Sequence, residues 1–247
     1  PLGTRDFLPF LPKVAAAKAD VVFITTWAAD QVACAKQVQE FGLARQARVI
    51  HSITELTFAE AAGAGVYENF YSGMPWYWHL KDKFPAAKRY YDRHMALRKR
   101  APGGYTASTY STVRLLLETA NEVKSLETDK VTRALEGRKF QHLKGPEQIR
   151  ACDHVNIQDV YLCKGKAAGA MKDAWDFFDI VQGVGGETSA ESCEGEGFDP
   201  KKPLRLSIKA LAQDQERQSF RQYQNEVKQA SKFGTFGDLL KNKGITK

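Results

Sequence analysis

The sequence predicts an α/β protein built on a doubly wound parallel sheet, because residues 1–42 alternate helix, strand and helix with short connections. The apolar run Val21–Ile24 has the composition of a short strand that is covered on both faces. A second helix is predicted to continue to Phe41 and to stop at Gly42. The first helix is predicted from apolar residues at the spacing i, i+3, i+4 and i+7, which are Phe7, Phe10, Leu11 and Val14.

The first candidate site follows the strand Val21–Ile24. Ligands bind to parallel sheets at the carboxyl ends of their strands, which is where Thr25, Thr26, Trp27 and Asp30 stand. Trp27 would supply an apolar wall for a small solute, and Thr26 would supply a hydroxyl for hydrogen bonding. The alternative is structural: Asp30 caps the second helix and Trp27 packs at the edge of the domain.

A second strand–helix unit is predicted after Gly42. Residues 48–51 form a strand, residues 52–55 a polar turn and residues 58–62 a short helix. Residues 66–71 alternate in polarity and predict a further strand. The aromatic cluster that follows has two interpretations, stacking on a sugar or base and packing at a hinge, of which packing is favoured; its residues are Trp76, Tyr77 and Trp78.

Two longer helices are predicted next. The first covers residues 84–100, and the second, at residues 106–124, is clearly amphipathic. Asp129 is predicted to cap a short helix that ends at Gly137. The shared apolar face of the second helix is formed by Tyr110, Val113, Leu116, Leu117 and Ala120.

The last part of this region is predicted to contain a hairpin and a linker. Strands at residues 148–151 and 159–164 would pair around the turn that contains His154. A catalytic role for His154 is disfavoured relative to a turn histidine, because no nucleophile motif or metal-ligand spacing accompanies it. Residues 183–197 are rich in Gly, Ser and Glu and predict a linker rather than a phosphate-binding loop.

Several phrases of the sequence carry a family resemblance. Near the start stand P-x-G-T-x-D-F-x-P-x-L, A-D-V-V-F, W-x-A-D and K-Q-x-x-E-F-G-L. Later in the chain, and in the same order, stand G-V-Y, Y-S-T-V-R-L-L, V-T-R-A-L-E-G and R-A-C-D-H followed by V-Y. Together these phrases resemble the solute-binding proteins of branched-chain amino-acid type ABC importers, over about residues 1–195.

The resemblance implies a type I periplasmic binding protein fold, with two lobes of parallel sheet and flanking helices. It further implies that residues 1–195 are the C-terminal portion of such a protein, that parts of both lobes are present, and that its N-terminal half is lacking. The chain starts with Pro1 and shows no signal peptide there, so a processed or incomplete chain is expected. No apolar run approaches the ~20 residues that span a bilayer.

The function implied by the resemblance is solute binding outside the cytoplasm, without catalysis and without a cofactor or metal. The expected partners are a small solute, such as an amino-acid-like compound, an amide or an aromatic acid, and the membrane permease of an ABC importer. The family places an aromatic residue over the ligand side chain after the first strand, which matches Trp27. It often places an acidic residue for the ligand's ammonium group after the next strand, where Glu55 is the nearest candidate. Ser52, at the start of the same turn, is a further candidate for ligand binding.

Glu55 also has a structural interpretation. It lies about two residues away from the family's acidic position, which speaks against an amino-acid-type ligand. A surface Glu at the start of a helix is the alternative, because a negative charge is favourable there.

The net charge of +7 is concentrated near the C-terminus. Residues 199–247 hold 11 Lys+Arg and 5 Asp+Glu, which leaves 25 Lys+Arg and 24 Asp+Glu in residues 1–198. A basic segment favours acidic partners such as RNA or anionic lipid, whereas a solvated charged helix is the simpler interpretation. Residues 196–247 are therefore expected to form a mainly helical, basic tail of separate origin.

The tail carries a second resemblance. Residues 204–209, and the phrase G-T-F-G-D-L-L at residues 234–240, resemble the end of an S-one-type RNA-binding domain. Only the last strand of such a barrel would be present, so RNA binding cannot be carried over residue by residue. RNA is expected as a partner only through residues 199–247, and a nucleic-acid-associated protein is the alternative function.

The four cysteines lack a C-x-x-C pair, which argues against a zinc or thioredoxin-like site. Cys34 lies between apolar residues of a predicted helix and is expected in the core. Cys152 and Cys193 can form a disulfide in an exported protein, although the sequence alone does not give the pairing.

Overall fold

The computed structural model describes residues 3–195 and residue 219. The predictions made for residues 196–247, which are the basic helical tail and its resemblance to an RNA-binding domain, lie outside the described residues, apart from residue 219.

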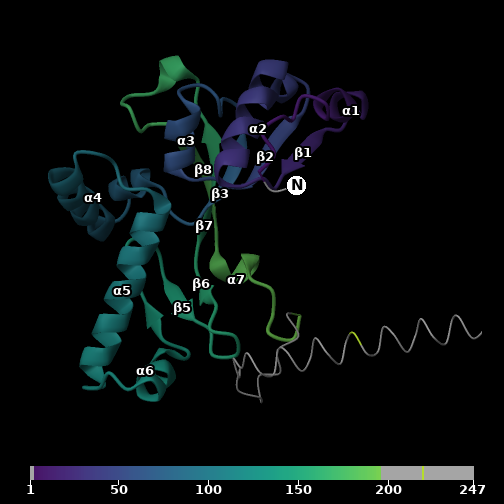
Figure 1. Ribbon diagram of the computed structural model, residues 1–247. Helices are drawn as coiled ribbons and strands as arrows, with labels where there is room; N and C mark the ends of the chain where they lie inside the picture. Colours follow the sequence, from purple (N-terminus) through teal and green to yellow (C-terminus); the bar gives the residue numbers. More distant parts are fainter. Residues whose placement is uncertain (1–2, 196–218, 220–247) are drawn as a thin grey trace, which may run out of the picture. The chain divides into compact units, whose positions relative to one another are not determined.

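Five strands form the larger sheet in residues 3–195, in the order β1-β2-β3-β7-β8 (Figure 1). Strand β1 pairs in parallel with β2, and β2 pairs in parallel with β3, so the prediction of a parallel sheet is confirmed for this part. Strands β7 and β8 extend the sheet antiparallel to their neighbours, which the prediction missed. The bounds are β1 Val21–Ile24, β2 Arg48–Ile53, β3 Tyr71–Met74, β7 Val160–Gly165 and β8 Phe178–Val184.

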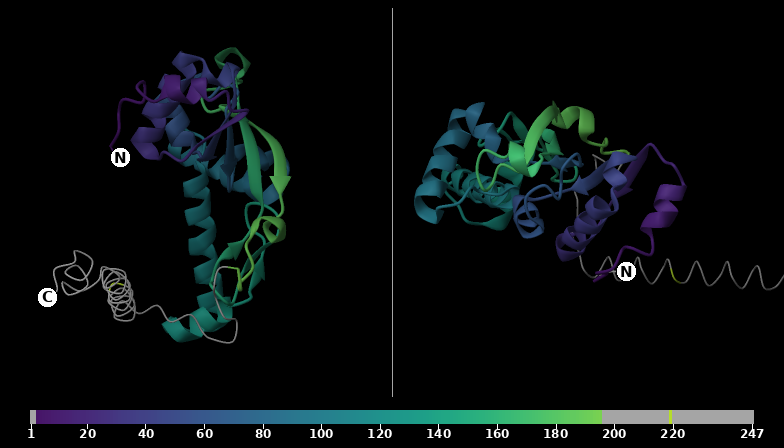
Figure 2. Two further views of the ribbon diagram at one scale, coloured as in Figure 1. Left: turned by 90° about the vertical axis from the view of Figure 1, so that its right-hand side faces the viewer. Right: turned by 90° about the horizontal axis from the view of Figure 1, so that it is seen from above.

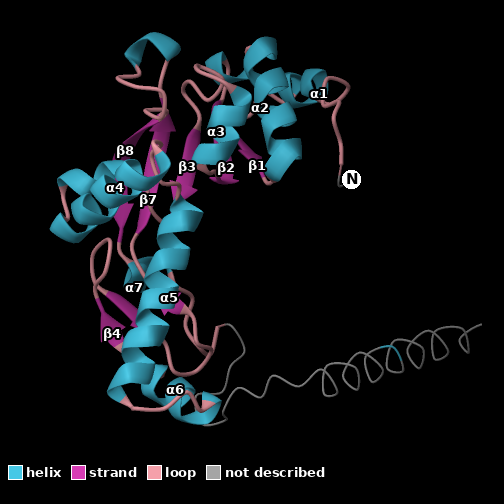
Figure 3. Cartoon of the chain, turned by 60° about the vertical axis from the view of Figure 1, so that its left-hand side comes forward, coloured by secondary structure: helices cyan, strands magenta, loops and turns pink. Residues whose placement is uncertain are grey.

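Helices α2 (Ala28–Phe41) and α3 (Leu56–Ala62) lie side by side against the sheet (Figure 3). Helix α2 buries Ala35 and Val38 in the same core as Val49 of β2. The helix ends at Gly42, whose φ of 78° is the left-handed conformation that glycine adopts most readily, so the predicted stop is confirmed. A short 3-10 helix, η1 (Leu43–Arg45), leads into β2.

Strand β1 is an edge strand in the described part of the chain. Val21 is 47% exposed and Phe23 is 62% exposed, so the prediction that this run is covered on both faces was wrong. Its only strand partner among residues 3–195 is β2, which leaves the other edge open. The helix before it, α1, is confined to Leu11–Ala16, and Phe10 is exposed, so the predicted apolar face is only partly helical.

The rest of the described chain is built from helices and a small antiparallel sheet of order β4-β5-β6 (Figure 2). Its strands are β4 Lys139–Phe140, β5 Glu147–Ile149 and β6 Asn156–Ile157. Its helices are η2 Trp78–Asp82, α4 Pro85–Arg98, α5 Gly104–Glu122, α6 Thr128–Leu135, η3 Ala168–Ala170 and α7 Gly186–Ser189. The two longest predicted helices are therefore confirmed, with ends shifted by one or two residues.

Three local predictions were wrong. The strand expected at residues 66–71 begins only at Tyr71, because the backbone turns at Gly65 and Asn69, which both have positive φ. The strand at residues 159–164 pairs with β3 and β8, and the hairpin partner of β5 is β6. Glu127, not Asp129, occupies the N-cap position of α6.

The predicted linker at residues 183–197 is also partly structured. Strand β8 continues to Val184, and α7 forms one turn immediately afterwards. A disulfide then joins Cys193 to Cys152, so the pairing that the sequence left open is formed in the structure. Cys34 is buried, as expected for a core residue.

The cluster of Trp76, Tyr77 and Trp78 belongs to the core. Each of the three side chains is at most 5% exposed, so the packing interpretation is confirmed. The Tyr77 hydroxyl donates to the carbonyl oxygen of Trp175 at 2.9 Å and accepts from the N–H of Phe178 at 3.2 Å. These hydrogen bonds fasten the segment after β3 to the start of β8.

Candidate functional site

The candidate site is built where β1 and β2 end. The side chain of Gln31, in the first turn of α2, is fully buried and binds both strand ends. Its Nε2 donates to the carbonyl oxygens of Thr26 at 3.1 Å and Ile53 at 2.8 Å. Its Oε1 accepts from the hydroxyls of Thr54 and Tyr67. Gln31 therefore sets the spacing of the two loops that carry the predicted site residues.

Trp27 occupies the N-cap position of α2 and stands half-exposed at this edge of the sheet. Its ring meets Phe58 of α3 edge-on, with ring centroids 5.1 Å apart, and meets Tyr105 of α5 at 5.9 Å. Three helices thus contribute one ring each to an aromatic corner. A rigid aromatic surface of this kind, with one side open, suits an apolar or aromatic group of a small ligand.

Glu55 occupies the N-cap position of α3, so its predicted place at the start of a helix is confirmed. The prediction that it lies on the surface was wrong, because the residue is only 5% exposed. Its Oε2 accepts from the N–H of Gly104, the first residue of α5, at 3.1 Å. A Cβ at Gly103 would lie 2.0 Å from the Glu55 Oε1, so a larger residue there would displace the carboxyl group from this position. The carboxyl group therefore ties the start of α3 to the start of α5.

Burial raises the pKa of Glu55 to about 7, even though backbone N–H groups of Tyr105, Gly104 and Leu56 favour its charged form. A carboxyl group with such a pKa exchanges its proton near neutral pH. It accepts hydrogen bonds when ionised and can also donate one when protonated.

The remaining predicted site residues point elsewhere or lie within secondary structure. Thr26 ends the loop that Gln31 holds, and its Oγ1 is buried. The Asp30 carboxylate accepts from the N–H of Gly3 at 2.8 Å, and Trp27, not Asp30, has the N-cap position. Ser52 is exposed and belongs to β2 itself, not to a turn after it. The structure therefore brings Trp27 and Glu55 together around Tyr105 and leaves Asp30 and Ser52 outside that corner.

Two contributing residues were missed by sequence reasoning. Gln31 gives no sequence signal, because a lone Gln in a helix is an ordinary surface residue until the fold buries it. Tyr105 follows the Gly103-Gly104 pair, which stands between the predicted helices at residues 84–100 and 106–124. That pair signals close packing, since both glycines lie against the Glu55 carboxyl group.

His154 is a turn histidine, as the favoured interpretation predicted. Its backbone N–H donates to the carbonyl oxygen of Arg150 at 2.9 Å, and its Nε2 lies 3.2 Å from the Glu136 Oε1. The residue has a φ of 60° and sits in the turn between β5 and β6. Within the described residues, no group of three His, Cys, Asp or Glu side chains has the arrangement of a metal site.

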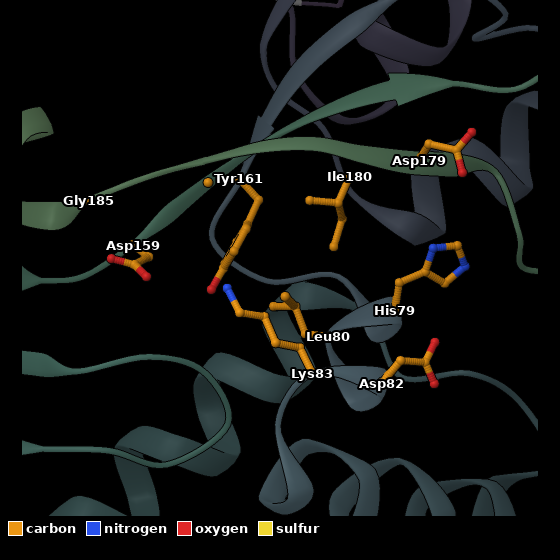
Figure 4. Close-up of a pocket in the computed structure, with 10 residues that line it drawn as sticks. His79, Leu80, Asp82, Lys83, Asp159, Tyr161, Asp179, Ile180 and Gly185 are labelled. Carbon is orange, nitrogen blue, oxygen red and sulfur yellow. The ribbon is translucent and has the colours of Figure 1, made fainter.

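A separate polar cleft of about 600 Å³ lies between η2 and the strands β7 and β8 (Figure 4). Lys83 and Tyr161 extend into it from opposite walls. Two of its carboxylates are engaged, because Asp179 pairs with Lys166 at 3.0 Å and Asp82 pairs with Lys81 at 2.8 Å. None of the predicted site residues lines this cleft.

Comparison with known proteins identifies the family. A family model described as periplasmic binding protein matches residues 1–170. The chain belongs to the periplasmic binding protein family. The family resemblance and the α/β fold predicted from the sequence are thereby confirmed, and the protein is extracytoplasmic like the family.

Solved structures of this family share the fold. An amino acid ABC transporter substrate-binding protein from Pseudomonas fluorescens is 24% identical with a TM-score of 0.73, and the match covers 80% of this chain and 52% of that one. A periplasmic binding protein from Burkholderia mallei is 25% identical with a TM-score of 0.69, and the match covers 79% and 51%. A branched chain amino acid ABC transporter periplasmic ligand-binding protein from Burkholderia xenovorans is 26% identical with a TM-score of 0.68, and the match covers 76% and 50%.

This periplasmic binding protein chain thus spans about half the length of the solved structures that it matches. Among curated protein sequences, none matches significantly. The comparisons give no support to the nucleic-acid alternative for residues 199–247. No helix within residues 3–195 has the length and apolarity needed to cross a membrane.

Proposed function

We propose that the chain is a solute-binding component of an ABC importer, which binds a small amino-acid-like compound, an amide or an aromatic acid and delivers it to a membrane permease. Family membership supports this function. The observation that carries it is the half-open aromatic corner of Trp27, Phe58 and Tyr105 above the buried carboxyl group of Glu55. In this proposal residues 1–195 are the solute-binding domain, and residues 196–247 are a separate segment.

The proposed mechanism is recognition without chemistry, so the protein is a binding protein and not an enzyme. Trp27 covers the apolar part of the solute, and Thr26 belongs to the loop that Gln31 holds beside it. Glu55 holds α3 and α5 in register beneath the corner. A solute stabilises the closed arrangement only as far as it contacts that arrangement better than the open one.

The proposal is tested with the substitution Trp27→Ala. Isothermal titration calorimetry would use leucine, benzamide and 4-hydroxybenzoate as probes of the three solute classes. Loss of the Trp27 ring removes most of the apolar wall, and we expect the affinity for the best probe to fall by about tenfold or more.

The matched control is Phe41→Ala, which removes an exposed ring from the opposite end of the same helix and is expected to leave affinity unchanged. Equal affinity in the Trp27 variant and the native protein would reject Trp27 as the wall. Absence of binding for every probe would count against the proposed solute classes.

A further inference from the structure

Three chain connections leave the five-stranded sheet close to one another. Pro75 follows β3, Gln158 and Asp159 lie between β6 and β7, and Gly185 lies between β8 and α7 (Figure 1). The last two connections touch, because a Cβ at Gly186 would lie 2.4 Å from the backbone nitrogen of Gln158. The connections before β7 and after β8 lead directly between the two sheets, so movement of the small sheet relative to the large one bends the chain there. The segment after Pro75 is instead held to the start of β8 through Tyr77 and Trp78.

The ammonium group of Lys144 lies between two of these connections and is almost completely buried. Its Nζ donates to the carbonyl oxygen of Pro75 at 2.7 Å and to that of Asp159 at 3.4 Å. It also donates to the side-chain oxygen of Gln158. An ammonium group has three N–H donors, and all three find acceptors, each of them on a connection.

The surroundings are built for this contact. A buried charge is costly unless its hydrogen-bonding capacity is satisfied. Burial lowers the pKa of Lys144, whereas the nearby negative charges of Glu147 and Asp159 raise it. Glu147 is itself only 5% exposed and accepts from the Asn156 side chain at 2.9 Å. The neighbouring Gly145 leaves room for Asp159, since a Cβ there would lie 2.9 Å from the Asp159 Oδ2.

We propose that Lys144 is a positioning residue that ties the connection after β3 to the connection before β7 and so limits the angles that the two sheets can adopt. The expected consequence is that Lys144 raises the population of the solute-binding arrangement, and this consequence rests on the proposed function. Apparent affinity falls in proportion to the fraction of molecules in the competent arrangement. Lys144 affects affinity in this way without contacting the solute.

The test compares Lys144→Met, which keeps the side-chain length and removes all three donors, with Lys144→Arg, which keeps the charge and the donors. Lys139→Met is the matched control, because Lys139 is exposed on β4. Hydrogen–deuterium exchange is followed in peptides that cover residues 74–78 and 157–160. We expect exchange in both peptides of Lys144→Met to accelerate by about tenfold, since local opening is no longer opposed by shared hydrogen bonds.

The rest of the chain supplies the reference. Peptides of β1 and β2 are expected to exchange as in the native protein, and the Arg variant is expected to regain at least half of the lost protection. Faster exchange spread evenly over the chain, or no change in the two connection peptides, would overturn the proposal. If Lys144→Met does not fold, Gln158→Leu removes one of the three acceptors and is expected to give a smaller acceleration in the same two peptides.

Affinity is the second readout. We expect the apparent Kd of the best probe to rise about threefold or more in Lys144→Met and to stay unchanged in Lys139→Met. The exchange experiment needs no solute, so it decides the role of Lys144 even when none of the probes binds. A protein that binds solute with equal Kd in both variants, despite faster exchange, would overturn the link to affinity and leave the proposed function intact.

Discussion

Strands β1 and β7, near opposite ends of the five-stranded sheet, have similarly apolar sequences but bury them to very different extents. In β1, at one edge, Phe23 is 62% exposed. In β7, between β3 and β8, Cys163 is fully buried and Tyr161 is 3% exposed. Both segments are apolar enough to be buried, and their places in the sheet decide whether they are. An apolar run therefore predicts that a segment can be buried. The strands and helices packed against it determine how much of its surface is buried.

The largest difference between the two sides is expected when one ring is removed from each. Phe178, at the start of β8, is fully buried and packs against Tyr67 and Tyr77. Phe178→Ala leaves a cavity there, and we expect the free energy of unfolding to fall by about 3–5 kcal/mol. Phe23→Ala removes a ring that is already mostly in water, and we expect a loss of less than about 1 kcal/mol. Guanidinium denaturation of both variants measures the two values.

A matched position checks that the contrast comes from burial and not from residue type. Phe70→Ala removes another fully buried ring and is expected to resemble Phe178→Ala. Similar losses for Phe23→Ala and Phe178→Ala would mean that the edge of β1 is covered in solution.

Two titratable groups at the end of β2 also have shifted pKa values, namely His51 within the strand and Glu55 at the N-cap of α3. Burial lowers the pKa of His51 to about 4, and neither of its ring nitrogens has a hydrogen-bond partner among the described residues. Burial raises the pKa of Glu55 to about 7. His51 therefore lowers stability as the pH falls from about 6.5 to about 4, and Glu55 lowers stability as the pH rises from about 4.5 to about 7.

The two effects oppose each other over the same pH range, and each amounts to about 3 kcal/mol. For Glu55→Gln we expect the free energy of unfolding to rise with pH between about 4.5 and 6.5, because the His51 effect remains. For His51→Phe we expect it to fall with pH over that range, because the Glu55 effect remains. Urea denaturation at several pH values measures both slopes, and the exposed Glu40→Gln serves as the control.

The native protein and the double variant complete the comparison. Both are expected to show a weaker slope than either single variant, because the opposing contributions are either both present or both absent. Two single variants with slopes of the same sign would contradict the assignment of these groups to opposite effects.

Sequence reasoning succeeded where local chemistry decides the structure. Gly42 ends α2 because its backbone is left-handed, and α4 and α5 form where helical periodicity is strong. It failed where distant contacts decide. Residues 159–164 have the pattern of a strand, but no local signal says that their partners are β3 and β8. In the candidate site, the place of Trp27 after β1 predicts a binding residue from the sequence, whereas the buried Gln31 that fixes the neighbouring loop carries no pattern of its own.

The smallest effect is expected on α5, where the contrast between buried and exposed apolar residues recurs within one helix. Leu115 is 5% exposed, whereas Leu117 is 62% exposed. Val113 and Leu116 of the same helix are exposed as well. We expect Leu117→Gln to change the free energy of unfolding by less than about 0.5 kcal/mol. For Leu115→Ala we expect a loss of about 2–5 kcal/mol, because it opens a cavity.

Thermal and chemical denaturation measures the loss of stability in these two variants. Both leucines lie in one helix but face different sides of it, so the comparison shows whether burial, and not the amphipathic pattern alone, sets the loss. A cost above about 1 kcal/mol for Leu117→Gln would show that the outer face of α5 is packed in solution. The same result in Leu117→Gln and Phe23→Ala would extend that conclusion to both exposed faces. A negligible change in the free energy of unfolding in both variants would establish that β1 and α5 carry more apolar residues than the fold of residues 3–195 buries.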